Sequence, residues 1–198
     1  MSIRRAVIFG APLLAYVAAL LHPHLMVGND PWLFIGVHLA LMMSVCLLAW
    51  MIVFLVEGID GVAAITARVL AIPFAVAYTL FTAFGGVTIG AFVWKANELP
   101  AGEQQPAAAL IHSVSHSALA HPLYLTASLL WLGAMLAVVA ALWGQGPLPA
   151  LALVAVGAAA FARSHVRPWG PAGMAAVLAG VIWLELKPRP ATEPRHED

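Results

Sequence analysis

Long apolar runs separated by short polar breaks dominate this chain. A helix that crosses the hydrocarbon core of a bilayer needs about 20 apolar residues, with roughly 17–25 tolerated. The breaks are rich in Pro, Gly and charged residues, and they read HPHLMVGNDP, EGIDG, KANELPAGEQQP, GQGP and RSHVRPWGP. The pattern predicts an all-α, polytopic transmembrane bundle with six spans near 6–22, 32–55, 66–94, 122–143, 148–163 and 170–186.

Composition agrees with this interpretation. Hydrophobic residues make up 63% of the chain and charged residues 9%, whereas soluble domains have about 45–50% and 25%. The lipid bilayer is therefore the expected environment. The formal net charge is zero with histidine neutral, so we expect no nucleic acid partner. Cys46 is the single cysteine, which excludes a disulfide within the chain.

Lys and Arg predict the orientation, because cytoplasmic loops keep an excess of these residues. Six spans put both termini on one side, and we expect that side to be the cytoplasm. It would hold Arg4, Arg5, Arg68, Lys187, Arg189 and Arg195, against Lys95, Arg163 and Arg167 opposite. We expect residues 1–186 to form one transmembrane domain and the Pro-rich, charged tail 187–198 to be disordered. The first apolar run lacks a clear small-x-small cleavage motif, so we expect a retained helix rather than a signal peptide.

The third segment is unusually long and contains Pro73 and the pair Gly85-Gly86. A tilt or a break is expected there. Gly86 and Gly90 form a GxxxG motif, which favours close helix packing. The alternative is an unwound stretch that lines a cavity, with Thr82, Gly85, Gly86 and Thr88 as its candidate residues.

An extra helix is predicted before the fourth span. Residues 107–143 contain one strong helix breaker, Pro122, and a straight helix of that length would measure about 55 Å, which exceeds the bilayer. We expect an interfacial helix over roughly 107–120 and a kink at Pro122. His112 and His116 are i,i+4 neighbours on that helix, a spacing at which two imidazoles can bind one metal ion.

Further histidines fall at the same predicted outer face. His22 and His24 flank a proline just after the first span, and an extended backbone would project both to one side, with Met26 or Asp30 near. His38 lies deeper, where an unpaired polar ring would cost about 1–3 kcal/mol. For His121, next to Pro122, a role in the bend is the simplest interpretation.

The sharpest hypothesis joins five of these residues in one outer-face site for a transition metal, Zn or Cu, or for haem b: His22, His24, His38, His112 and His116. His38, His112, His116 and His121 are the candidate haem contacts. Such a site would serve metal handling, sensing or electron transfer, with a quinone or a second copy of the chain as partner.

Two alternatives stay open. One is a small-solute or proton-coupled transporter, in which the broken third span forms the path and histidines relay protons. The other is a structural or accessory subunit whose histidines are simply interfacial. The chain contains no HExxH and no GxSxG, which favours a protein that is not an enzyme. Catalytic residues are unassigned, and an enzyme would have to be metal- or haem-dependent.

The stretches LLHPH, VHLALMM and ARVLAIPFAVAYTLFTAFGGVTIGAF resemble a group of small multi-pass bacterial membrane proteins that is frequent in actinobacteria. They cover about a third of the chain. The resemblance implies a helical bundle in the inner membrane of a bacterium, and it implies no activity.

Overall fold

A computed structural model describes residues 2–23, 27–28, 30–116 and 120–186, and within these ranges it is helical with no strands. The expectation of an all-α bundle is therefore confirmed. The helices are α1 (Ile3–Leu21), α2 (Pro31–Leu55), α3 (Val62–Thr82), η1 (Ala83–Thr88), α4 (Ile89–Asn97), α5 (Ala101–Ser115), α6 (Ala120–Ala141), α7 (Leu148–Arg163) and α8 (Trp169–Leu186). The predicted tail 187–198 lies outside the described residues.

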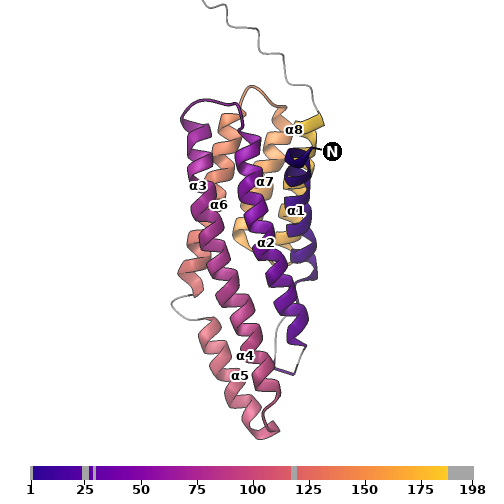
Figure 1. Ribbon diagram of the computed structural model, residues 1–198, viewed down its shortest axis with the longest axis vertical. Coiled ribbons are helices and arrows are strands. Elements are labelled where there is room, and N and C mark those ends of the chain that lie inside the picture. The colour runs from indigo at the N-terminus through magenta and orange to yellow at the C-terminus, as the bar shows by residue number, and fades with distance from the viewer. Residues whose placement is uncertain (1, 24–26, 29, 117–119, 187–198) are drawn as a thin grey trace, which may run out of the picture.

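Five of the predicted spans are matched by helical segments that are long and apolar enough to cross a membrane. They are Ile3–Leu21, Pro31–Leu55, Val62–Asn97, Trp169–Leu186 and the stretch Ala101–Ala141, which contains α5 and α6 as separate helices. The remaining apolar helix, α7, has 16 residues and falls short of that length. The helices run side by side, and the first residues of α1 lie at the same end of the bundle as the end of α8 (Figure 1).

A partly buried ion pair joins the start of α1 to the end of α8. The guanidinium of Arg4 donates two hydrogen bonds to the carboxylate of Glu185, at 2.7 and 2.8 Å, and a third to the carbonyl of Phe54 at the end of α2. The Glu185 side chain is 7% exposed. An even number of passes requires both ends to lie together, and this contact fulfils that requirement.

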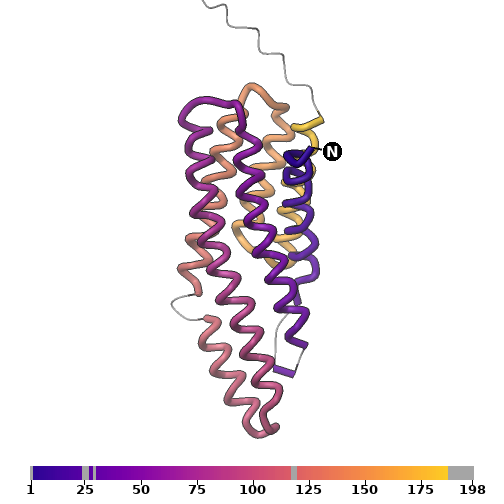
Figure 2. The backbone as a smooth tube through the Cα atoms, viewed as in Figure 1, coloured from indigo at the N-terminus to yellow at the C-terminus, as the bar shows by residue number. Residues whose placement is uncertain are grey.

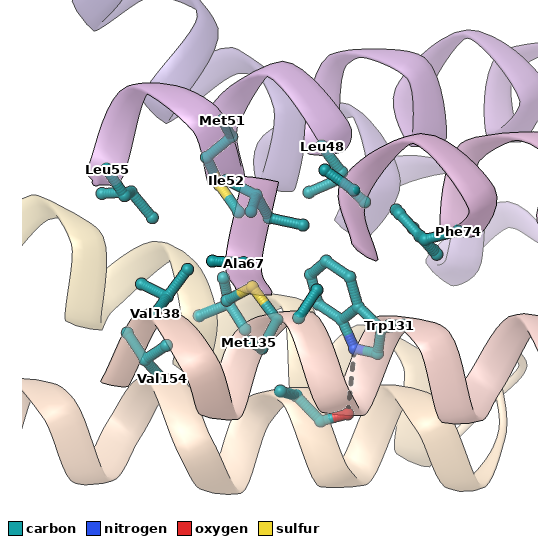
Figure 3. Packing of buried hydrophobic residues seen from close by; sticks show 14 of the residues in the cluster. Leu48, Met51, Ile52, Leu55, Ala67, Phe74, Trp131, Met135, Val138 and Val154 are labelled. Atoms are coloured by element: carbon teal, nitrogen blue, oxygen red, sulfur yellow. Dashed lines mark hydrogen bonds between the residues drawn. The ribbon is translucent and has the colours of Figure 1, made fainter. Parts of the chain in front are cut away.

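The core of the bundle combines a few large side chains with many small ones. Trp131 of α6 is fully buried beside Phe74 and Phe161, and its indole N–H donates to the carbonyl of Ala158 in α7 at 3.0 Å (Figure 3). Helices α7 and α8 approach so closely that a Cβ on Gly173 would lie 2.7 Å from the carbonyl oxygen of Gly157. Small residues at such crossings let two backbones pack directly, as is typical of membrane helices.

The third span is a continuous helix that changes winding at its centre. Residues Ala83–Thr88 form a π-helix, η1, between α3 and α4. An unwound stretch is therefore not present, and the expected break takes the form of wider helical turns. Gly86 lies against α2 at the ring of His38, and Gly90 lies against Ile35. The GxxxG motif thus packs helices closely, as the simpler interpretation predicted.

The extra helix differs from its predicted form. Helix α5 begins at Ala101 and ends at Ser115, and it lies beside α4 as a hairpin that extends past the rest of the bundle (Figures 1 and 2). None of its side chains is buried. Pro122 is the third residue of α6 rather than a mid-helix kink, because a proline in the first turn leaves no hydrogen bond unmade.

Candidate metal centre

Three histidines from distant parts of the chain meet near the end of the bundle opposite the two termini. They are His22, at the end of α1, His38, in α2, and His165, in the turn between α7 and α8. One ligand nitrogen from each lies within 4.8 Å of the other two. We call these residues the histidine triad.

His22 reaches this position because its helix ends there. It is the C-cap of α1, with an extended backbone at φ −60° and ψ 111°. The next residue is Pro23, and a proline disfavours helical geometry in the residue before it. Its carbonyl also accepts a hydrogen bond from Arg167, at 3.4 Å. The dipeptide His22-Pro23 therefore stops the helix and leaves the imidazole at the bundle's rim.

His38 is buried at 3% exposure, and its ring has a fixed orientation. Its Nδ1 lies 2.8 Å from the carbonyl oxygen of Phe34, one turn earlier in α2. A carbonyl can only accept, so Nδ1 carries the proton and Nε2 presents its lone pair. A backbone carbonyl holding the far nitrogen is a common support for a metal-binding histidine. On its open side the ring rests on Gly86 of η1, where any Cβ would overlap it.

His165 is held in the turn by close backbone packing. Its carbonyl lies so near Gly170 that a Cβ there would overlap it. The ring faces inward, with the rings of Phe81, Tyr124 and Tyr78 at centroid distances of 5.5, 6.0 and 6.1 Å. Its Nδ1 is buried and has no hydrogen-bond partner among the described residues. Burial among aromatic rings disfavours a charged imidazolium, so the ring is neutral, the form that binds a metal.

The spacing of His22 and His38 fits a single ion, and a shift of the His165 side chain would bring the third nitrogen, which lies within 4.8 Å of the other two, to the same ion. Nε2 of His22 lies 3.3 Å from Nε2 of His38. Two nitrogens bound tetrahedrally to one metal, with bonds of about 2.0–2.1 Å, lie about 3.3–3.4 Å apart. The same two atoms share a hydrogen bond, which Nε2–H of His22 donates to the lone pair of His38, because Nδ1 of His38 carries that ring's proton. A metal ion would replace that proton.

The structure brings together only part of the predicted set. His22 and His38 meet, as expected, whereas His24 and Met26 lie outside the described residues. Asp30 caps α2 by accepting from the amide of Trp32 at 2.9 Å and is not part of the triad. His112 of α5 and His116, the C-cap of that helix, lie next to each other with ring centroids 4.2 Å apart, but neither belongs to the triad.

The remaining predicted residues have other surroundings. His121 is exposed in the first turn of α6. The hydroxyls of Thr82 and Thr88 donate to carbonyls of their own helix. Gly85 lines a cavity, whereas Gly86 packs against His38. Glu185, near the inner end of the last span, pairs with Arg4.

Sequence reasoning missed His165 as a partner of His22 and His38. The usable signal was its position, since the break RSHVRPWGP falls on the same side of the six-span topology as LLHPH. What the sequence did not show is that the turn between α7 and α8 folds over the end of α1.

No protein-family model, curated protein or solved structure matches this chain.

Proposed function

We propose that this protein is an integral membrane metal-binding protein and that the histidine triad holds one transition-metal ion. The observation that carries the proposal is the meeting of three imidazoles from three separate elements within 4.8 Å. Burying a polar group without a partner costs about 1–3 kcal/mol. The Nδ1 of His165 is buried and has no hydrogen-bond partner among the described residues, so it carries such a cost. A bound ion would hold the three rings together.

The ligand set favours copper or zinc. Imidazole nitrogen suits both metals, whereas Mg²⁺ and Ca²⁺ prefer oxygen. No carboxylate belongs to the triad among the described residues, so three neutral ligands would leave the ion's charge uncompensated in an apolar setting. Cu⁺ carries a single charge, so its burial among neutral ligands has the smallest electrostatic cost. Zn²⁺ would complete its tetrahedron with an anionic fourth ligand such as hydroxide.

Haem fits the same residues less well. Two histidines on opposite sides of a haem iron would have their ligand nitrogens about 4 Å apart, with the macrocycle between the rings. Nε2 of His22 and Nε2 of His38 are 3.3 Å apart, and the His38 ring is enclosed by Gly86 on one side and Phe34 on the other. A bare ion requires no such separation.

The proposed role is metal handling at the outer face of the cell membrane. The triad lies at the end of the bundle away from Arg4, Arg5 and Arg68, which the excess of basic residues assigns to the cytoplasm. With both termini inside, the triad faces the extracytoplasmic side. Sensing and electron transfer remain further uses of the same ion.

Metal analysis of the purified protein tests the proposal. We expect about one tightly bound Cu⁺ or Zn²⁺ per chain in the wild type, and Co²⁺ should give the visible absorption of a tetrahedral, nitrogen-ligated ion. His38→Ala and His165→Ala should each weaken binding by about 10-fold or more, as the loss of a support or ligand typically does. His121→Ala is the control and should bind as the wild type does. Wild-type protein that takes up neither metal would overturn the proposal.

Transport of the same ion is a second candidate, because a cavity of about 450 Å³ reaches Gly85 of the π-helix, close to the triad. Proteoliposomes separate the two functions. Transport predicts that Zn²⁺ or Cu⁺ added outside reaches an indicator sealed inside, and that His38→Ala abolishes this flux. A handling protein would bind the ion without passing it across.

A further inference from the structure

A cavity lies between the α4–α5 hairpin and the bundle. It has a volume of about 450 Å³, and its walls come from α2, η1, α4, α5 and the loop before α2. Most of the lining is apolar. Three polar side chains line it as well: His112 and Ser115 of α5, and His116, the C-cap of that helix. An apolar cavity with a few convergent polar groups is the usual form of a small-ligand site.

The two histidines of this cavity lie next to each other, and the tautomer of one is fixed. His112 and His116 have ring centroids 4.2 Å apart. Nδ1 of His116 lies 2.9 Å from the carbonyl oxygen of His112, so it carries the proton and leaves Nε2 with a free lone pair. His38 is held in the same way by the carbonyl of Phe34, four residues earlier. The same support thus recurs in the cavity and in the triad.

One aromatic ring separates the cavity from the triad. Phe34 lines the cavity, and its ring also contacts His38 at a centroid distance of 4.2 Å and His22 at 5.6 Å. Beside it, Gly85 lines the cavity while the next residue, Gly86, touches the His38 ring. Phe34 and the pair Gly85-Gly86 therefore form a boundary that the cavity and the triad share.

We propose that His112 and His116 form a second metal-binding site, which captures a transition-metal ion in this cavity and delivers it past Phe34 to the triad. This inference rests on the proposed function of the triad. Two exposed ligands with water completing the coordination bind more weakly than three converging ones, which suits a site that must release its ion. Turning the Phe34 side chain would open the way between the two sites.

Loading kinetics of the full-length protein in lipid nanodiscs test the delivery step. Wild-type protein should bind two Co²⁺ ions, one tightly and one weakly. The double variant His112→Ala/His116→Ala should bind one, with the affinity of the tight site unchanged. Its loading at micromolar Co²⁺ should be slower by about 10-fold or more, because a captured ion is present at a high effective concentration beside the triad. Phe34→Leu should load faster than the wild type.

Four outcomes separate this inference from the proposed function on which it rests. His121 belongs neither to the triad nor to the His112–His116 pair, so His121→Ala should keep the wild-type stoichiometry and loading rate. His38→Ala should lose the tight ion and keep the weak one. If the double variant still binds two ions or loads at the wild-type rate, the capture site is wrong while the triad stands. If the wild type binds no Co²⁺, Zn²⁺ or Cu⁺, the proposed function itself fails.

Discussion

At the scale of single residues, glycine decides where the His38 imidazole can lie. The ring needs the space above Gly86, because any Cβ at that position would overlap it. The neighbouring Gly85 leaves room for a side chain, because a Cβ there would meet only the Phe81 ring, at 3.5 Å. Two adjacent glycines of one π-helix therefore have different roles.

Gly86→Ala should displace the His38 ring. We expect weaker Co²⁺ binding and a loss of stability of about 1–3 kcal/mol, the usual cost of overpacking a tight core. Thermal unfolding in detergent and Co²⁺ titration measure the two effects. Gly85→Ala is the matched control, and it should change both quantities little. Equal effects of the two substitutions would show that Gly86 does not position the imidazole.

At the scale of helices, the sequence predicted what local patterns determine and missed what depends on neighbours. The six apolar segments follow from run length, and the predicted 148–163 coincides with α7. The π-helix within Val62–Asn97 was not predicted, because local patterns do not show the close packing of Gly86 and Gly90 against α2. The start of α5 was also missed, since its pairing with α4 is a tertiary contact and its sequence carries little apolar signal.

The contact between α6 and α7 gives a prediction at this scale. Trp131→Phe removes the N–H that donates to the carbonyl of Ala158 and some buried ring area. We expect a loss of about 0.5–1.5 kcal/mol from the hydrogen bond, read as a lower unfolding temperature. Trp143→Phe, at a tryptophan that is 65% exposed, should leave that temperature nearly unchanged. A matching loss in both variants would contradict a specific role for the indole.

At the scale of the whole molecule, one ion pair closes the bundle. Arg4 and Glu185 join the two ends of the chain, and Glu57 lies 3.4 Å from the same guanidinium. At the opposite end, the histidine triad joins α1, α2 and the α7–α8 turn. The approach of His22 to His38 could be predicted from the topology of the spans. The approach of His165 to them could not, because it depends on how the α7–α8 turn packs.

Glu185→Gln should destabilise the bundle, because the amide weakens the hydrogen bonds and leaves the half-buried Arg4 without its main counter-charge. We expect a loss of about 1–3 kcal/mol, the range for hydrogen bonds to charged groups. Glu98→Gln, in the exposed pair with Lys95, is the control and should cost no more than about 1 kcal/mol. Urea or thermal unfolding of both variants distinguishes the two sites, and a Glu185→Gln loss as small as the control's would contradict the closing role.

The shortness of α7 has an electrical consequence. Its 16 residues span about 24 Å, less than the roughly 30 Å hydrocarbon thickness. In the proposed orientation, the turn that carries His165 would therefore lie below the outer membrane surface. His38 lies seven residues beyond the first residue of α2. A cation in the triad would therefore sit part of the way across the voltage drop. Full transit of one charge is worth about 2.3 kcal/mol per 100 mV, and the proposed orientation makes an inside-negative potential draw the ion inward. An energised cell would hold its metal more tightly than a depolarised one.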